Sequence, residues 1–276
     1  GSTFKPIVAA AALDNGVIDE HSSILSIGGI RIGTFFFPDW KAGGHGIVDV
    51  RTALAWSVNT FFYIAGGGYL EKDGLGITRL MDSAAKFGLG KPLGIDLPGE
   101  AKGFLPSAKW KEETKGEPWY IGDTYHVSIG QGDILVTPLQ VAAYTSAIAN
   151  GGILYVPEVA DYFVSDSQEQ QIEPKILQQR VASPESLEIV RQGLRMAVTT
   201  GSARLLSYLP FKVAGKTGTA QGGIDRPNHA WFTGFAPYAD PSIAITVLVE
   251  EGGEGSSTAV PIAKEIFGWW YQQENN

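Results

Sequence analysis

The 276-residue sequence contains no cysteine, which excludes disulfide bonds and thiolate metal sites and is compatible with a bacterial extracytoplasmic location. It has no apolar run near the roughly 20 residues that a membrane-spanning helix needs, and we expect no signal peptide within the given residues. It also has no excess of positive charge, since its formal net charge is −8 at pH 7. This charge argues against nucleic acid and against an anionic membrane surface as main partners.

What the sequence does have is the composition of an ordinary globular chain, with 44% hydrophobic and 18% charged residues. Apolar periodicity and capping residues predict helices over residues 2–13, 50–56, 61–65, 77–87, 138–149, 184–199 and 259–271. Strands are predicted over residues 30–37, 211–219, 230–236 and 243–249. We expect residues 88–136 to be irregular and residues 153–182 to form a surface hairpin or excursion.

The first five residues are predicted to open a buried helix and to carry a nucleophile. Because proline lacks a backbone N–H, Pro6 is tolerated only in the first helical turn, so the helix begins within a residue or two of Ser2. The small apolar residues 7–13 belong in a core, and the N-terminus of such a helix favours negative charge. Lys5 shares the face of Ser2. Burial would lower the pKa of Lys5, which lets it accept the proton of the Ser2 hydroxyl.

The spacing of Ser2 and Lys5 is weak evidence when taken alone, because the same spacing recurs at Ser83 and Lys86. Ser83 lies late in a predicted amphipathic helix, far from any helix N-terminus. We therefore interpret Ser83 and Lys86 as structural residues. Only partners from elsewhere in the chain can distinguish Ser2 from this second serine.

One group of partners is Lys216-Thr217-Gly218-Thr219, on a predicted strand. Alternation places Lys216 and Gly218 on one face and Thr217 and Thr219 on the other, unless twist or a bulge re-aims them. A lysine with neighbouring hydroxyls suits the binding of a carboxylate. Glycine lets a ligand or another backbone approach closely.

Two shorter stretches also carry polar groups that could serve chemistry. Ser57 and Asn59 lie between two predicted helices, where a hydroxyl could relay protons and an amide could hold a peptide carbonyl. Gln131 lies between two glycines, which offer flexible backbone beside its side chain. Taken alone, each stretch would be read as a capping loop or a turn.

Together and in this order, the motifs Ser2-x-x-Lys5, Ser57-x-Asn59 and Lys216-Thr217-Gly218 resemble the signature of the penicillin-binding protein and serine β-lactamase superfamily. Most of the chain is similar to the transpeptidase domain of class B, elongation-type penicillin-binding proteins, the penicillin-binding protein 2 kind. The further stretches that carry this resemblance are Asp39-Trp40-Lys41, Gly44-His45-Gly46, residues 59–63, Lys86-Phe87-Gly88, residues 94–97, 119–124 and 129–132, residues 137–140, and Gly218-Thr219-Ala220-Gln221.

The resemblance implies an α+β fold in which an antiparallel sheet is covered by helices and accompanied by a mainly helical lobe. It implies one transpeptidase domain over residues 1–276, with a helical and loop lobe over 1–200 and the sheet strands and C-terminal helix over 201–276. In the family, strands and a helix precede the helix of the nucleophile, as do a pedestal domain and a membrane anchor. We therefore expect this domain to be truncated at its N-terminus and its sheet to lack those first strands.

The resemblance also implies catalytic roles. Ser2 would attack the penultimate carbonyl of a stem peptide that ends in D-alanyl-D-alanine, and Lys5 would be the base. Ser57 would relay protons to the leaving group, and Asn59 would hold the donor peptide. The backbone N–H groups of Ser2 and Thr219 would form the oxyanion hole.

Substrate-binding roles follow from the same resemblance. Lys216 and Thr217 would bind the terminal carboxylate of the peptide, or the carboxylate of a β-lactam. Gly218 and Gln131 would belong to the same substrate-binding surface. No cofactor and no metal ion are expected.

The function that the resemblance implies is that of a peptidoglycan D,D-transpeptidase. An amine from a neighbouring stem peptide would resolve the acyl-enzyme and cross-link the wall, and β-lactams would inhibit the enzyme covalently. The expected partners are stem peptides, β-lactams and, for the full-length protein, a membrane glycosyltransferase of the elongation machinery, but no nucleic acid. The expected location is the extracytoplasmic face of the bacterial plasma membrane.

Three alternatives stay open at the level of sequence. A class D-like β-lactamase shares the Ser-Thr-Phe-Lys form of the motif, although it would hydrolyse penicillin instead of staying acylated. A non-catalytic sensor module would bind β-lactam or stem peptide without turnover. A D,D-carboxypeptidase differs only in using water instead of an amine as the acceptor.

Other polar residues are open to more than one interpretation. Asp39 and His45 could ligate a metal, but without clear further ligands a structural or substrate-lining role is favoured. The acidic cluster Glu250, Glu251 and Glu254 is interpreted as a solvated turn.

Overall fold

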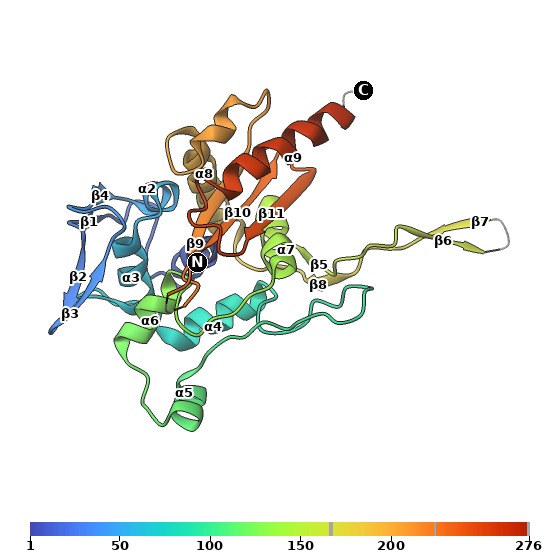
Figure 1. Cartoon of the computed structure of the whole chain (residues 1–276). Helices are drawn as coiled ribbons and strands as arrows, with labels where there is room; N and C mark the ends of the chain where they lie inside the picture. The colour runs from blue at the N-terminus through green and yellow to red at the C-terminus, as the bar shows by residue number, and fades with distance from the viewer. Residues whose placement is uncertain (166–167, 224, 275–276) are drawn as a thin grey trace.

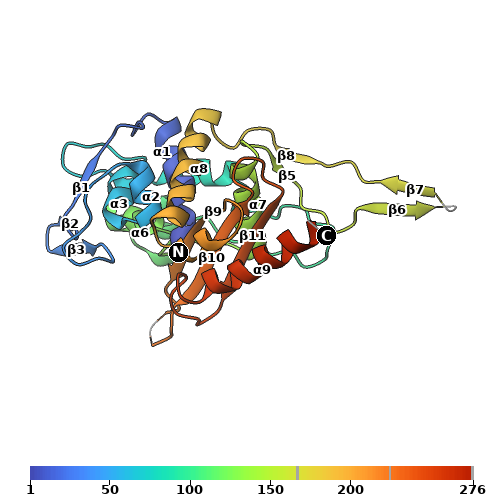
Figure 2. The same cartoon turned by 90° about the horizontal axis from the view of Figure 1, so that it is seen from above.

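The computed structural model describes residues 1–165, 168–223 and 225–274, and these form an α+β fold (Figure 1). Helices surround a small antiparallel sheet, and short two-stranded ribbons extend at two opposite sides of the molecule (Figures 1 and 2). The N-terminus lies beside the sheet. The predicted fold class is confirmed.

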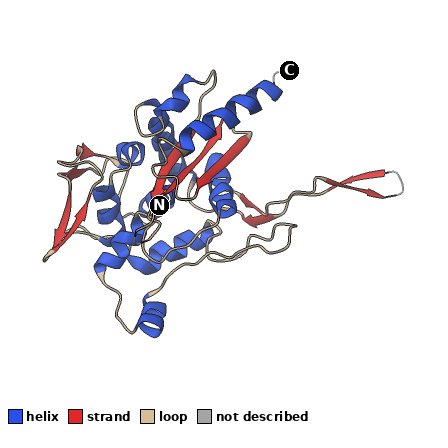
Figure 3. Ribbon diagram, in the orientation of Figure 1, coloured by secondary structure: helices blue, strands red, loops and turns tan. Residues whose placement is uncertain are grey.

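The central sheet has the order β11-β10-β9 and is antiparallel throughout (Figure 3). Strand β10 (His229–Ala236) and strand β11 (Ile243–Val249) lie where the alternation pattern predicts them. Strand β9 (Ala214–Ala220) begins later than the predicted 211–219. The reason is that Phe211 leaves the sheet and stacks its ring on Tyr271, with centroids 4.8 Å apart.

The side chains of β10 alternate between two apolar cores. Trp231 and Phe235 face the main core, whereas Ala230 and Phe232 face a second core that helix α9 (Ala259–Glu274) covers. On the face towards the main core, Thr233 shares a hydrogen bond of 2.7 Å with Thr145 of helix α7 (Pro138–Ala149). The sheet is therefore buried on both faces, with helices on each side.

The predicted N-terminal helix is present and is buried up to Ala12. A single 3-10 turn, η1 (Ser2–Phe4), leads into α1 (Lys5–Asp14), and residues 7–12 are almost completely inaccessible to solvent. Their small side chains let the neighbouring helices approach α1 closely. The hydroxyl of Tyr144 donates to the Thr3 carbonyl at 2.8 Å, which fixes the turn that carries Ser2.

Helices α2 (Val50–Trp56) and α3 (Asn59–Gly67) flank the Ser57 corner. Asp49 caps α2, because its carboxylate accepts from the Thr52 N–H at 2.8 Å. Helix α3 begins two residues before the predicted 61. The Asp39 carboxylate explains this earlier start, since it accepts from the Thr60 N–H at 2.9 Å and satisfies a free donor of the first turn.

The second serine–lysine pair is structural, as interpreted from the sequence. It lies in α4 (Gly76–Lys86), where the buried Ser83 hydroxyl donates to the Arg79 carbonyl at 2.8 Å. Lys86, in the last turn of α4, is exposed. Ser83 is therefore engaged within its own helix, and Lys86 faces solvent.

The prediction of one strand over residues 30–37 is wrong. The chain turns at Gly33, whose φ of 57° suits glycine, and forms a hairpin of β2 (Gly29–Ile32) and β3 (Phe35–Pro38). Strands β1 (Ile24–Ser26) and β4 (Gly46–Val48) pair beside it.

The prediction that residues 88–136 are irregular is also wrong, because this stretch holds α5 (Ala108–Lys115) and α6 (Ile121–Ser128). Helix α5 is polar and only eight residues long, and it is delimited by its ends. The Ser107 hydroxyl accepts from the Trp110 N–H at 3.1 Å, and Gly116 adopts φ 69° after its last turn. Such a helix has no apolar period that a sequence pattern could detect.

Residues 153–182 form the predicted surface excursion. Strands β5 (Leu154–Tyr155) and β8 (Ile176–Gln178) pair at its base, and β6 (Tyr162–Ser165) with β7 (Gln168–Gln171) forms a ribbon that projects from the body (Figures 1 and 2). The two residues between β6 and β7 lie outside the described part of the chain.

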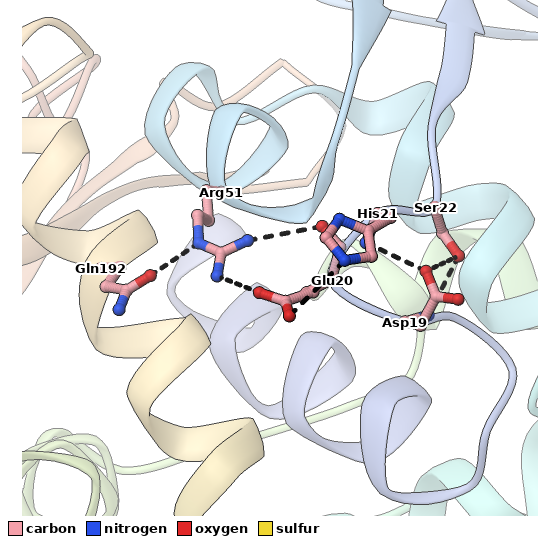
Figure 4. Close-up of polar contacts among 6 residues, drawn as sticks. All are labelled: Asp19, Glu20, His21, Ser22, Arg51 and Gln192. Carbon is pink, nitrogen blue, oxygen red and sulfur yellow. Dashed lines mark hydrogen bonds and ion pairs between the residues drawn. The ribbon is translucent and has the colours of Figure 1, made fainter.

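An arginine ties the segment after α1 to two helices (Figure 4). Arg51 of α2 donates to the Gln192 amide oxygen at 2.7 Å, on α8 (Pro184–Thr199), and to the Glu20 carboxylate at 2.8 Å. Asp19 and Ser22 close the adjoining turn with a hydrogen bond of 2.8 Å. This network holds α2 and α8 to the segment that follows α1.

In residues 1–165, 168–223 and 225–274, no helix combines the length and the hydrophobicity that crossing a membrane requires.

Candidate active site

A cleft of about 390 Å³ lies where η1, β9 and the loops around α2 and α6 meet. It brings together residues from all the motifs that the sequence singled out, which are up to about two hundred positions apart in the chain. Those that line it are Ser2, Ser57, Asn59, Gln131, Thr217 and Thr219, with Gly218 between the last two.

Ser2 lies in the first turn of the chain, half-buried at the cleft. Strand β9 passes directly beside this turn: a Cβ atom added at Gly218 would lie only 3.0 Å from the Thr3 Cγ2 and 3.1 Å from the Trp231 Cβ. A larger residue at position 218 would therefore force β9 away from η1. Glycine is what lets the Thr217–Thr219 backbone lie against the turn that carries Ser2.

Lys5 is completely buried and faces the corner between α2 and α3. Its Nζ donates to the Ser57 carbonyl at 2.8 Å, the Ser57 Oγ at 3.1 Å and the Asn59 Oδ1 at 2.6 Å. Burial, and then repulsion by Lys216, holds the pKa of Lys5 well below its usual value, while the Asp39 carboxylate partly opposes this shift. The predicted lowering is confirmed. Among the described residues, no hydrogen bond joins Lys5 to the Ser2 hydroxyl.

The backbone at Ser57 explains how this residue reaches Lys5 twice. Ser57 ends α2 with a positive φ of 56°, an uncommon conformation for a residue other than glycine. The turn directs both its carbonyl and its hydroxyl at the Lys5 Nζ. Asn59 then uses both ends of its amide within the protein, because its Nδ2 donates to the Pro38 carbonyl at 3.1 Å.

The structure separates Lys216 from the rest of its motif. Lys216 is completely buried, is not part of the cleft wall, and donates from Nζ to the Thr217 carbonyl at 3.1 Å. Burial lowers the pKa of Lys216 to about 7. Thr217 does line the cleft, and its hydroxyl lies 2.6 Å from the Ser202 Oγ.

Gln131 connects the loop after α6 to the end of β9. Its Nε2 donates to the Thr219 carbonyl at 3.1 Å, and its Oε1 accepts from the Gln221 N–H at 3.3 Å. The amide of Gln131 therefore donates to and accepts from the backbone at the end of β9, in the way that the backbone of a neighbouring strand would.

Asp39 and His45 are connected through Ser26, whose hydroxyl accepts from the His45 N–H at 3.0 Å and donates to the Asp39 carboxylate. The Asp39 carboxylate is buried and accepts from the hydroxyls of Ser26 and Thr60 at 2.7 and 2.6 Å, besides the Thr60 N–H, which gives it a structural role. The His45 ring packs against Trp40, with centroids 5.1 Å apart. Within the described ranges, no three His, Cys, Asp or Glu side chains are grouped so that they could hold a metal ion.

Sequence reasoning missed two kinds of cleft residue. Trp40 and Trp56 form part of the wall, and the Trp40 indole donates to the Trp56 carbonyl at 2.8 Å. Glu254, assigned to a solvated turn, is exposed but lines the cleft, and it accepts from the Thr219 hydroxyl at 2.8 Å. The expected exposure of Glu254 is confirmed, whereas its contact with Thr219 was not predicted.

The glycines around Glu254 were a signal that could have revealed its position. A Cβ at Gly255 would lie 2.3 Å from the Gly218 carbonyl oxygen and 2.4 Å from that of Trp231. This segment therefore lies directly on the sheet, which a freely solvated turn would not do.

Comparison with known proteins gives one consistent family. Residues 1–268 match the penicillin binding protein transpeptidase domain. The peptidoglycan D,D-transpeptidase MrdA of Haemophilus influenzae is 32% identical over 99% of this chain. The structure of Pseudomonas aeruginosa PBP2 in complex with WCK 5153 is 35% identical, with a TM-score of 0.86 over 98% of this chain and 60% of that one. PBP2 of Helicobacter pylori in complex with MreC is 34% identical, with a TM-score of 0.82 over 96% of this chain and 48% of that one.

The alignment covers nearly all of this chain but less than half of the relative. The chain spans 44% of the length of the Haemophilus influenzae relative. What is compared is therefore a catalytic-domain-sized part of longer proteins.

Proposed function

Because the chain belongs to the penicillin-binding protein transpeptidase domain family, we propose that it catalyses D,D-transpeptidation of peptidoglycan stem peptides. The observation that carries this proposal is the convergence of Ser2, Lys5, Ser57 and Asn59 at the end of one buried helix, beside β9. Ser2 is the nucleophile and the acyl donor ends in D-alanyl-D-alanine.

Acylation uses the lowered pKa of Lys5. The Ser2 Oγ bonds to the penultimate carbonyl carbon and gives its proton to the unprotonated Lys5 amine, whose charged form is disfavoured by burial. The bond from that carbon to the terminal D-alanine nitrogen then breaks. The leaving nitrogen receives the proton through the Ser57 hydroxyl, which lies 3.1 Å from the Lys5 Nζ.

The contact between β9 and η1 positions the oxyanion hole. The backbone N–H groups of Ser2 and Thr219 stabilise the developing oxyanion, and loss of one such donor raises the barrier by about 3 kcal/mol. Gly218 permits this contact, and the side chain of Gln131 holds the Thr219 backbone in place.

The donor carboxylate binds near Thr217, which precedes Gly218 and Thr219 in the Lys216–Thr219 motif. The hydroxyls of Thr217 and Ser202 face each other at the cleft and can donate to it. Lys216, when protonated, supplies positive charge from beneath the strand. Asn59 holds the peptide once its contacts with Lys5 and Pro38 are exchanged for substrate.

The location and partners of the full-length protein are proposed from its relatives. We infer that the domain acts on the extracytoplasmic face of the bacterial plasma membrane, beside a glycosyltransferase of the elongation machinery. The PBP2–MreC complex of Helicobacter pylori and a structural neighbour from a peptidoglycan synthase complex support this inference. The names of the relatives favour the transpeptidase over the β-lactamase and sensor alternatives.

The first test follows the intact mass of the protein for hours after benzylpenicillin is added. We expect one stable adduct in the unmodified chain and none in Ser2→Ala. Lys5→Ala should acylate more slowly by about a hundredfold or more, because it lacks the base.

The matched control is Ser83→Ala, which removes the serine of the other serine–lysine pair. This variant should acylate at the unmodified rate. An adduct that forms equally in Ser2→Ala would contradict the assignment of the nucleophile, and rapid release of hydrolysed penicillin would favour the β-lactamase.

A further inference from the structure

Glu254 is the one formally charged side chain in the wall of the cleft, as far as the described residues show. The rest of the wall consists of hydroxyl, amide, aromatic and aliphatic groups and a glycine. The lysines nearby, Lys5 and Lys216, are completely buried below the wall. A ligand in the cleft therefore meets a carboxylate at this position and no exposed counter-charge.

The position of this carboxylate is fixed by the strand that bears the catalytic motif. The Thr219 hydroxyl donates to the Glu254 Oε2 at 2.8 Å, and the Gly255 N–H donates to the same hydroxyl at 3.4 Å. Gly255 packs against the Gly218 carbonyl without room for a side chain. Glu254 is thus held at the end of β9, beside the residue that supplies an oxyanion donor.

Glu254 also has unused capacity to accept hydrogen bonds. No described residue donates to its Oε1, and none of the described cations forms an ion pair with it. An ionised carboxylate offers about four acceptor positions. Such a group favours a cationic ligand and repels an anionic one.

The two substrates of transpeptidation carry opposite charges. The acyl donor ends in a carboxylate, which suits the Thr217 and Lys216 side of the site. The acceptor brings a primary amine, which is protonated in neutral water. The charge at Glu254 matches the acceptor and opposes the donor.

We propose that Glu254 is the binding group of an acceptor subsite that selects primary ammonium groups. This inference rests on the proposed function and adds a substrate-selecting residue to it. The bound ammonium gives one proton to solvent before it attacks. The amine nitrogen then bonds to the acyl carbon, the ester bond to the Ser2 Oγ breaks, and a second proton passes from the nitrogen through Lys5 to that oxygen.

A consequence is that the cleft favours an amine over an uncharged acceptor. Water gains nothing from the carboxylate, whereas an ammonium is concentrated next to the acyl-enzyme. Glu254 therefore shifts the balance from hydrolysis towards cross-linking.

The test is a competition between two acceptors for one acyl-enzyme. A synthetic peptide ending in D-alanyl-D-lactate acylates the protein in the presence of Nα-acetyl-lysinamide, which carries an ammonium, and hydroxylamine, which is uncharged at neutral pH. Mass spectrometry measures the ratio of amide to hydroxamate product. Because both products arise from the same intermediate, the ratio is independent of the acylation rate.

Glu254→Gln should lower this ratio about fivefold, the size expected for one exposed ion pair. Glutamine can still accept from the Thr219 hydroxyl, so loss of a merely structural contact would not move the ratio. High salt should lower the ratio of the unmodified protein towards that of the variant. Glu250→Gln, in the same acidic segment but outside the cleft wall, should leave the ratio unchanged.

Different results would overturn the proposed function and the ammonium subsite. If the unmodified protein forms no acyl-enzyme, the proposed function is overturned, and this inference with it. If acyl-enzyme forms but Glu254→Gln and the unmodified protein give equal ratios, only the ammonium subsite is overturned.

Discussion

The proposed chemistry of the site rests on two buried lysines with different surroundings. Lys5 has three oxygen contacts within 3.1 Å, whereas Lys216, among the described residues, donates only to the carbonyl of the next residue. Burial lowers the pKa of both, and repulsion between them adds to the lowering at Lys5. Each lysine is thereby held closer to its neutral form than an exposed lysine would be.

The pKa of Lys216 predicts a pH-dependent preference for donors with a carboxylate. Lys216 is charged below its pKa of about 7 and neutral above it, so attraction for a carboxylate is present at lower pH and is lost as the pH rises through that value. We expect acylation by a peptide with a free carboxylate, relative to its methyl ester, to fall about tenfold between pH 6 and pH 9. Stopped assays of both donors measure this ratio.

Taking the ratio of the two donors removes the contribution of Lys5, which titrates in the same way with either. Lys216→Gln should flatten the pH profile of the ratio. A ratio that stays constant with pH in the unmodified protein would refute the role of Lys216.

At the scale of elements, the site depends on how closely β9 approaches η1. The two lie far apart in the sequence, yet a Cβ atom added at Gly218 would come within 3.0 to 3.2 Å of Thr3, tighter than ordinary contact. Burial of both elements keeps them together, and the hydrogen bond from the Tyr144 hydroxyl to the Thr3 carbonyl fixes the turn that carries Ser2. The proposed oxyanion donors, the N–H groups of Ser2 and Thr219, depend on this contact, which neither element makes alone.

Gly218→Ala should therefore impair acylation more than it impairs folding. The added methyl group would lie 3.0 Å from the Thr3 Cγ2 and 3.2 Å from the Thr3 nitrogen, so β9 has to shift. We expect the free energy of unfolding to fall by about 1–3 kcal/mol, and acylation to slow by about a hundredfold. Urea titration and the rate of penicillin adduct formation measure the two effects.

Gly268→Ala is the matched control for this change. Gly268 lies in α9, where an added Cβ would meet its nearest neighbour, Leu209, at 3.9 Å. This variant should acylate normally and be unchanged or slightly more stable, because alanine favours helix. Normal acylation in Gly218→Ala would show that the close contact is dispensable.

At the scale of the whole molecule, the catalytic cleft and the projecting ribbon of β6 and β7 are separate. The ribbon extends away from the sheet and helices (Figures 1 and 2). The side chains of Tyr162, Phe163 and Val164 are exposed. No described residue of the excursion lines the cleft. As far as it is described, the ribbon therefore contributes little to the core and nothing to the cleft wall.

Replacing residues 162–171 with a short Gly-Ser turn should leave the rate of benzylpenicillin acylation within about twofold of the original. The strands β5 and β8 at the base of the excursion remain in this variant, so the fold should be retained. The rate of adduct formation and the thermal midpoint check the expectation. A large loss of acylation at an unchanged midpoint would mean that the ribbon acts on the cleft.

Local signals in the sequence predicted much of the fold. Caps and prolines located α2, α7 and α8, because the residues that satisfy a helix terminus lie within a few positions of it. Alternation located β10 and β11. The short helices α5 and α6 and the β2–β3 hairpin were missed, since their patterns are brief and lack a clear apolar period.

By itself, the sequence determined the buried N-terminal helix, the serine and lysine on its first turns, and the three motifs whose order indicates the family. Tertiary structure alone decided what those residues touch: Lys5 holds Ser57 and Asn59 instead of Ser2, Lys216 lies below the cleft wall, and Glu254 enters that wall. The physical reason is distance along the chain. Periodicity and capping act over a few residues, whereas burial, charge and close contact depend on which distant segments the fold brings together.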